Sequence, residues 1–159
     1  MTYVFAGVRA RKGDSGGGGI FRRDLSAERW EHVFTAADTQ AVTIDPRHPE
    51  VIYAGTSGGP YRSTDRGRSW ERLGFPDDDA QVWSIGFDPG GKIVYAGGSP
   101  VAVYRSDDGG DTFRRLPDPD LPPRVNMGFA CRVMRIAAHP HEAGLLFAAL
   151  EVGGAMQSR

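Results

Sequence analysis

Ser63-Thr64-Asp65-Arg66-Gly67-Arg68-Ser69-Trp70 is the stretch that decides the fold, because it recurs further along the chain. Its second copy is Ser106-Asp107-Asp108-Gly109-Gly110-Asp111-Thr112-Phe113, in which serine, aspartate, glycine and an aromatic residue keep their spacing. Residues 21–30 form a degenerate third copy, which retains both aromatic ends but has Leu25 where the aspartate should stand. Recurrence at a fixed period indicates a repeated structural unit rather than a single catalytic motif.

A second signal precedes each copy and indicates that every unit contains several strands. It is a short apolar segment whose second residue is aromatic, and in three units a proline turn comes before it, at Asp45-Pro46, Asp88-Pro89 and His139-Pro140. Short apolar or alternating runs between turn residues predict β-strands, here four per unit. Units of this length with four strands are typical of β-propeller blades. The apolar segments are Val4-Phe5-Ala6-Gly7, Ile52-Tyr53-Ala54-Gly55, Val94-Tyr95-Ala96-Gly97 and Leu146-Phe147-Ala148-Ala149.

We therefore expect an all-β chain that forms a single partial propeller of four-stranded antiparallel blades over residues 1–159. The expected division is a partial blade at 1–38, a blade at 39–81, a blade with a long link at 82–131 and a truncated blade at 132–159. Residues 153–159 align with residues 58–64, so the chain is expected to be a piece of a longer propeller. Repetition at equivalent sites predicts burial of Ile44, Ile52, Tyr53, Trp70, Ile85, Phe87, Val94, Tyr95, Phe113, Ile136 and Phe147.

The recurring pattern resembles the Asp-box, or bacterial neuraminidase repeat (BNR), of the sialidase-like β-propeller superfamily. That superfamily includes sialidases, xyloglucanases, sortilin-type receptors, photosystem assembly factors and many bacterial proteins of unknown function. The resemblance implies a six- or seven-bladed parent, of which this chain supplies about three to four blades. It also implies that the repeated residues fasten a hairpin turn, in which aspartate accepts backbone amides and glycine takes a positive φ. Those residues are Ser63, Asp65, Gly67, Trp70, Ser106, Asp108, Gly110 and Phe113.

Composition excludes several classes of function. The chain has 19 basic and 20 acidic residues, without the basic excess of a nucleic-acid binder. A single cysteine, Cys131, excludes an intrachain disulfide and a multi-cysteine metal site. No apolar run reaches the length of a membrane span or signal peptide, so a cytoplasmic protein without a membrane partner is expected. Neither a cofactor nor a metal site is expected.

Candidate site residues lie on the blade face opposite the Asp-boxes, which is the face that carries the active centre in enzymes of the superfamily. The sialidase signature Phe-Arg-Ile-Pro is matched here only at Arg135 and Ile136. Arg135, Arg132 and Arg124 are the candidate anion contacts, although Arg135 could instead pair with a neighbouring carboxylate. Two hypotheses follow. One is a non-catalytic scaffold or binding module for carbohydrate or protein, which could also self-associate through its open blade ends. The other is a fragment of a glycoside hydrolase of sialidase or xyloglucanase type.

Overall fold

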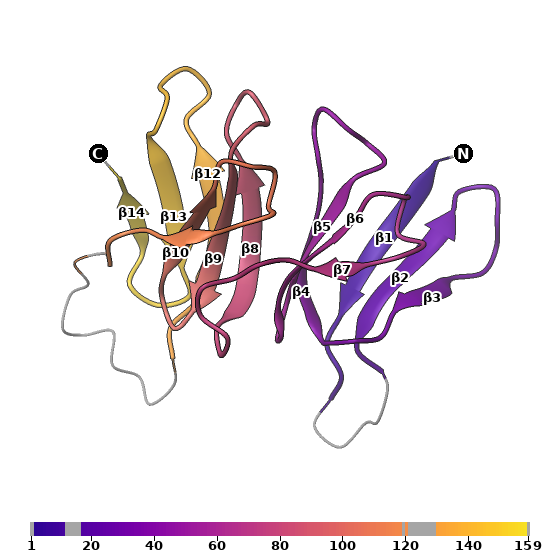
Figure 1. Cartoon of the computed structure of the whole chain (residues 1–159). Helices are drawn as coiled ribbons and strands as arrows, with labels where there is room; N and C mark the ends of the chain where they lie inside the picture. The colour runs from indigo at the N-terminus through magenta and orange to yellow at the C-terminus, as the bar shows by residue number, and fades with distance from the viewer. Residues whose placement is uncertain (1, 12–16, 119, 121–129, 159) are drawn as a thin grey trace.

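Four antiparallel β-sheets make up the computed structural model of the chain, which describes residues 2–11, 17–118, 120 and 130–158. Within these ranges the chain contains strands, turns and bends but no helix. The sheets stand side by side in chain order, and the two termini lie at opposite ends of the row (Figure 1). The second and third sheets have four strands each, whereas the first and last have three.

Each sheet is a meander in which consecutive strands pair. The first sheet consists of β1 (Tyr3–Val8), β2 (Gly19–Asp24) and β3 (Glu31–Phe34), and the second of β4 (Thr39–Ile44), β5 (Ile52–Thr56), β6 (Gly59–Ser63) and β7 (Glu71–Arg72). The third contains β8 (Gln81–Phe87), β9 (Val94–Ser99), β10 (Val103–Ser106) and β11 (Arg114–Arg115), and the fourth β12 (Val133–Ala138), β13 (Leu146–Leu150) and β14 (Ala155–Gln157).

Neighbouring sheets bury their faces against each other. A separate apolar cluster fills each of the three interfaces, with Ile20 and Phe34 in the first, Tyr53 and Val82 in the second, and Val133 in the third. Burial of this apolar area is the main term that holds the row together. The all-β prediction and the prediction of a partial β-propeller are confirmed.

Neighbouring inner strands lie side by side, β4 beside β8 and β8 beside β12, and they also exchange polar contacts. Thr43 Oγ1 donates a hydrogen bond to the Ile85 carbonyl over 3.1 Å, and Ser84 Oγ donates to the Val133 carbonyl over 2.9 Å. Each inner strand also contains a bulge at the same point of its pairing, at Gln40, Trp83 or Met134. A bulge redirects the side chain of the inserted residue, so these three positions break the regular alternation.

Burial follows the repeat, with two exceptions. Ile52, Tyr53, Ile85, Val94, Tyr95, Phe113 and Ile136 are buried as predicted, while Trp70 and Phe87 are half-buried. The predictions for Ile44 and Phe147 are wrong, since these side chains are 46% and 38% exposed. Ile44 ends β4 beside a proline turn. Phe147 points away from the third sheet, toward the side of the last sheet that no described residue covers.

In the described part of the chain, no helix has the length and apolar character needed to cross a membrane.

Candidate functional site

Ser63 and Asp65 close the turn between β6 and β7 with a network of hydrogen bonds. Ser63 Oγ donates to Asp65 Oδ1 over 2.9 Å and accepts the amide of Gly67 over 2.7 Å. Asp65 accepts the amides of Arg68 and Ser69 over 2.8 and 2.9 Å. Gly67 has a φ of 78°, which lets the chain reverse without the strain that a side chain would add. The turn therefore uses its own serine and aspartate to satisfy its backbone.

The turn between β10 and β11 repeats this network. Ser106 Oγ donates to Asp108 Oδ1 over 2.7 Å and accepts the amide of Gly110, also over 2.7 Å. Asp108 accepts the amide and the hydroxyl of Thr112 over 3.0 and 2.6 Å. Residues 63–70 and 106–113 are called the Ser–Asp turns below. The aromatic residues that end them, Trp70 and Phe113, pack into the first and second interfaces respectively.

Hydrogen bonding keeps both turn aspartates ionised. Burial alone raises the pKa of Asp65, but hydrogen bonds led by the hydroxyl and amide of Ser69 outweigh burial and lower this pKa to about 2. The hydroxyl and amide of Thr112 are the main cause that lowers the pKa of Asp108 to about 2. The carboxylate oxygens of both aspartates are occupied by local donors, so neither is poised as a general acid at neutral pH.

A second cluster lies at the opposite edge of the sheets from the proline turns. Arg9 Cζ lies 5.0 Å from the centroid of the Trp83 ring, and Arg132 Cζ lies 4.1 Å from the same centroid. Arg132 also donates a hydrogen bond to Glu151 Oε1 over 3.1 Å. We call Arg9, Trp83, Arg132 and Glu151 the Trp83 cluster.

Three sheets contribute to the Trp83 cluster. Arg9 follows β1, Trp83 lies in β8, Arg132 precedes β12 and Glu151 follows β13. The ends of β1 and β13 and the starts of β8 and β12 lie at the lower edge in Figure 1, whereas the loops that contain the proline turns form the upper edge. Of the two guanidinium groups, only that of Arg132 pairs with a carboxylate of the described residues, which leaves an excess of positive charge beside a half-buried aromatic ring. Such a site can bind a carboxylate, since arginine offers paired donors to it.

The structure describes two of the three candidate arginines, and these two lie in different surroundings. Arg132 belongs to the Trp83 cluster. Arg135 is exposed on β12, and no contact with a carboxylate of the described residues is present. Arg124 lies outside the described residues. The site therefore rests on Arg132 together with Arg9, and Arg135 does not join it.

Trp83 was not singled out by the sequence analysis. The register places Trp83 at the bulge of β8, where the other inner strands carry Gln40 and Met134. A comparison of these three equivalent positions could have singled out the tryptophan as the residue that departs from its counterparts. The approach of Arg9 from the first sheet could not have been found in this way, because it depends on how the row of sheets curves.

Comparisons with known proteins show the fold. No protein-family model and no curated protein matches the chain. An ancestral GH74 enzyme superposes with a TM-score of 0.67 and 18% identity, over 91% of this chain and 20% of that one. For YCF48 from Cyanidioschyzon merolae the TM-score is 0.64 at 17% identity, over 90% of this chain and 45% of that one. YCF48 bound to D1 peptide gives 0.57 at 22% identity, over 76% of this chain and 36% of that one.

The chain thus spans less than half the length of each of these structures. The neighbours differ in function, since one is an enzyme and another is bound to a peptide, and the sequence identities are low. What they share is the β-propeller, and the chain has the fold of a partial β-propeller.

Proposed function

We propose that the chain is a non-catalytic propeller module that binds an acidic segment of a protein partner at the Trp83 cluster. The observation that carries this proposal is the pair of guanidinium groups over one indole ring, at 5.0 and 4.1 Å. Stacking restricts the arginine side chains before a ligand arrives, so less conformational entropy is lost on binding.

The charge balance favours an acidic ligand. Glu151 pairs with Arg132, whereas Arg9 has no carboxylate partner among the described residues. A carboxylate that approaches the cluster gains donors without first breaking an ion pair of Arg9. The structure of YCF48 bound to D1 peptide supports the idea that propellers of this shape can hold a polypeptide.

We further infer that the Ser–Asp turns are Asp-boxes and that the chain is related to the sialidase-like propellers through them. The shared serine, aspartate and glycine contacts of the two turns support this inference. In this proposal the Asp-boxes stabilise the blades, whereas residues at the opposite edge of the sheets bind the partner. Stability and binding therefore depend on different residues.

The alternative is that the chain is part of a glycoside hydrolase. The observation that favours it is that Trp83 and Glu151 both contact Arg132, because aromatic rings and carboxylates also suit sugars. Glycoside hydrolysis requires two carboxyl groups that flank the scissile bond. The Trp83 cluster contains one carboxyl group, that of Glu151, and it pairs with Arg132. We therefore expect the chain to release no reducing sugar from xyloglucan.

Isothermal titration of the full chain with a hexaglutamate peptide tests the proposal. Saturable binding should weaken at least about tenfold in Arg132→Gln, the loss expected when a charge-assisted hydrogen bond is removed. Arg29→Gln is the matched control, because Arg29 is an exposed arginine in the turn between β2 and β3. Equal affinity for hexaglutamine, or equal weakening by both substitutions, would contradict the proposal.

A further inference from the structure

An arginine recurs at one position in the first three sheets, as Arg22 on β2, Arg62 on β6 and Arg105 on β10. Arg62 Nη1 donates a hydrogen bond to the carbonyl of Gly109, in the Ser–Asp turn of the following sheet, over 2.9 Å. Arg22 Nη1 donates in the same way to the carbonyl of Arg66, over 2.8 Å. Arg22 and Arg62 therefore occupy equivalent places in the first and second interfaces.

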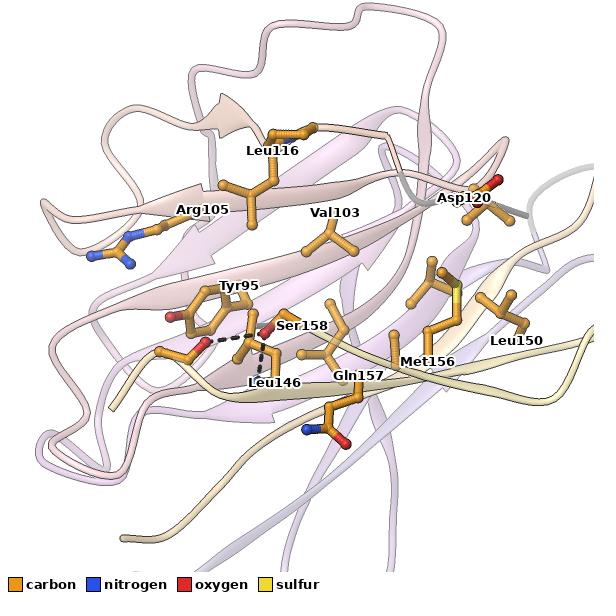
Figure 2. Close-up of a pocket in the computed structure, with 16 residues that line it drawn as sticks. Tyr95, Val103, Arg105, Leu116, Asp120, Leu146, Leu150, Met156, Gln157 and Ser158 are labelled. Carbon is orange, nitrogen blue, oxygen red and sulfur yellow. Dashed lines mark hydrogen bonds between the residues drawn. The ribbon is translucent and has the colours of Figure 1, made fainter. Parts of the chain in front are cut away.

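The guanidinium group of Arg62 is paired with two carboxylates. Its Nη2 lies 2.8 Å from Glu71 Oε1 and 2.7 Å from Asp111 Oδ1. Arg105 lies at one end of the groove between the third and fourth sheets (Figure 2), and its Nε donates to Asp107 Oδ1 over 2.9 Å. Aspartates of the turn 106–113 thus help to neutralise both arginines.

Arg22 lacks the second carboxylate. Its Nη2 pairs with Glu31 Oε2 over 2.5 Å, but its buried Nε has no hydrogen-bond partner among the described residues. Arg68 stands in the turn 63–70 at the position that Asp111 has in the next turn. A positive side chain therefore begins where the second interface supplies a negative one.

Arg66 adds a third guanidinium group to this place. Its counterpart in the next turn is Gly109, and both residues have a positive φ, 61° at Arg66 and 75° at Gly109. Among the described residues, Arg66 is the only one other than glycine with a positive φ. That conformation is strained for a residue with a side chain, and strain of this kind is typical of functional positions. An arginine stands here although glycine would fit the turn without strain.

The two arginines of the turn have no counter-ion in the described part of the chain. Arg66 and Arg68 are exposed, and neither forms an ion pair there. Asp65 of the same turn accepts the turn's own amides and the hydroxyl of Ser69. Guanidinium groups that lie close together repel one another unless an anion compensates their charge. The arrangement is therefore one that a bound anion would stabilise.

We propose that Arg22, Arg66 and Arg68 bind a phosphorylated serine or threonine in a segment of a partner protein. The two unpaired guanidinium groups match the double negative charge of a phosphomonoester, and the planar donors of arginine suit its oxygens. This surface shares no residue with the Trp83 cluster.

The surroundings of the three arginines favour a phosphate that is carried on a polypeptide. Arg66 and Arg68 lie at an exposed turn, whereas sites for small molecules are concave. The neighbouring turn 106–113 contains three aspartates, which would repel an extended polyanion such as RNA. A single phosphoryl group avoids that repulsion.

A labelled peptide with one phosphoserine between uncharged glycine and serine residues tests the site by fluorescence anisotropy with the full chain. We expect saturable binding, and at least about tenfold weaker binding of the same peptide with unmodified serine. Arg68→Asp should also weaken binding at least about tenfold, because it introduces the residue type that pairs with Arg62 in the second interface. Arg114→Asp is the matched control, since Arg114 is an exposed arginine of the third sheet and the change in charge is the same. It should leave binding unchanged.

Arg66→Gly separates binding from folding. This substitution removes the strained conformation, so the melting temperature should not fall, while binding of the phosphopeptide should weaken at least about tenfold. Unchanged binding in Arg66→Gly would contradict the proposal, because a purely structural arginine would be replaced there without loss.

Competition identifies the source of the anion. Inorganic phosphate, hexaglutamate and a short single-stranded RNA should each fail to displace the phosphopeptide when added at the same concentration. Displacement by any of them would overturn the proposal, in favour of a site for free phosphate, for acidic segments in general or for nucleic acid. Equal binding of the phosphorylated and unmodified peptides, or equal effects of Arg68→Asp and Arg114→Asp, would overturn it as well.

Discussion

At the scale of single residues, the two turn aspartates make stability depend on pH. Their pKa values are lowered to about 2, below the value of 3.8 for an unperturbed aspartate. A folded-state pKa below the unfolded one contributes stability above the unfolded pKa, and that contribution is lost as the pH falls through the folded pKa. We therefore expect the melting temperature to fall between about pH 4 and pH 2.

Asp65→Asn separates this effect from general acid denaturation. The variant should be less stable than the parent at pH 7 by about 1 to 2 kcal/mol, because turn donors lose a charged acceptor. The difference should shrink as the pH falls toward 2. Asp79→Asn serves as the control, since Asp79 is exposed and has no hydrogen bond or ion pair within the described residues. A constant difference between Asp65→Asn and the parent across this range would contradict the assignment.

At the scale of elements, each of the first two sheets packs an aromatic side chain against a glycine of the following Ser–Asp turn. Alanine should therefore be tolerated less well at such a glycine than at a glycine with similar backbone geometry and open space around it. Gly110 and Gly144 have φ values of 95° and 84°, so alanine is strained at both. Only at Gly110 would the added Cβ meet a neighbour, Tyr53 Cε1 at 2.9 Å, while at Gly144 nothing lies within 4 Å. Gly110→Ala should therefore cost about 1 to 3 kcal/mol more than Gly144→Ala in urea melts. Equal costs would mean that the aromatic contact contributes nothing.

The same scale shows what sequence can predict. The repeated Ser-x-Asp-x-Gly pattern predicted the positions of hairpins, because a tight turn needs its own hydrogen bonds and a positive φ wherever it occurs. It could not reveal that Arg22 and Arg62 donate hydrogen bonds to the following turn, although the arginine recurs in the first three units and is replaced by Gln157 in the fourth. That contact depends on how sheets pack, and so do the exposure of Phe147 and the bulge that turns Trp83 toward Arg9.

At the scale of the whole molecule, the ends of the row should promote self-association. Phe147 is 38% exposed on the outer side of the last sheet, and β1 and β14 each have an edge unpaired by the described residues. Exposed apolar residues and open edges template contacts between chains. We expect the weight-average mass from sedimentation to rise with concentration. Phe147→Lys should shift this rise to at least about threefold higher concentration, a shift of the size that a modest apolar contact gives.

Ile44→Lys provides the comparison, because Ile44 is 46% exposed but lies on an inner strand of the second sheet rather than at an end of the row. It should leave the association unchanged. A monomer at all concentrations would contradict the predicted self-association.

The indole N–H resonances of the three tryptophans test the central claim most directly, because the residues report on three different places. Trp30 follows the turn after β2, Trp70 packs in the first interface and Trp83 lies beneath the two arginines. In a ¹⁵N NMR titration with hexaglutamate, the account predicts a saturable shift of the Trp83 signal while Trp30 and Trp70 stay in place, and loss of this shift in Arg132→Gln. A Trp83 signal that does not move, or a shift centred on Trp30 or Trp70, would contradict it.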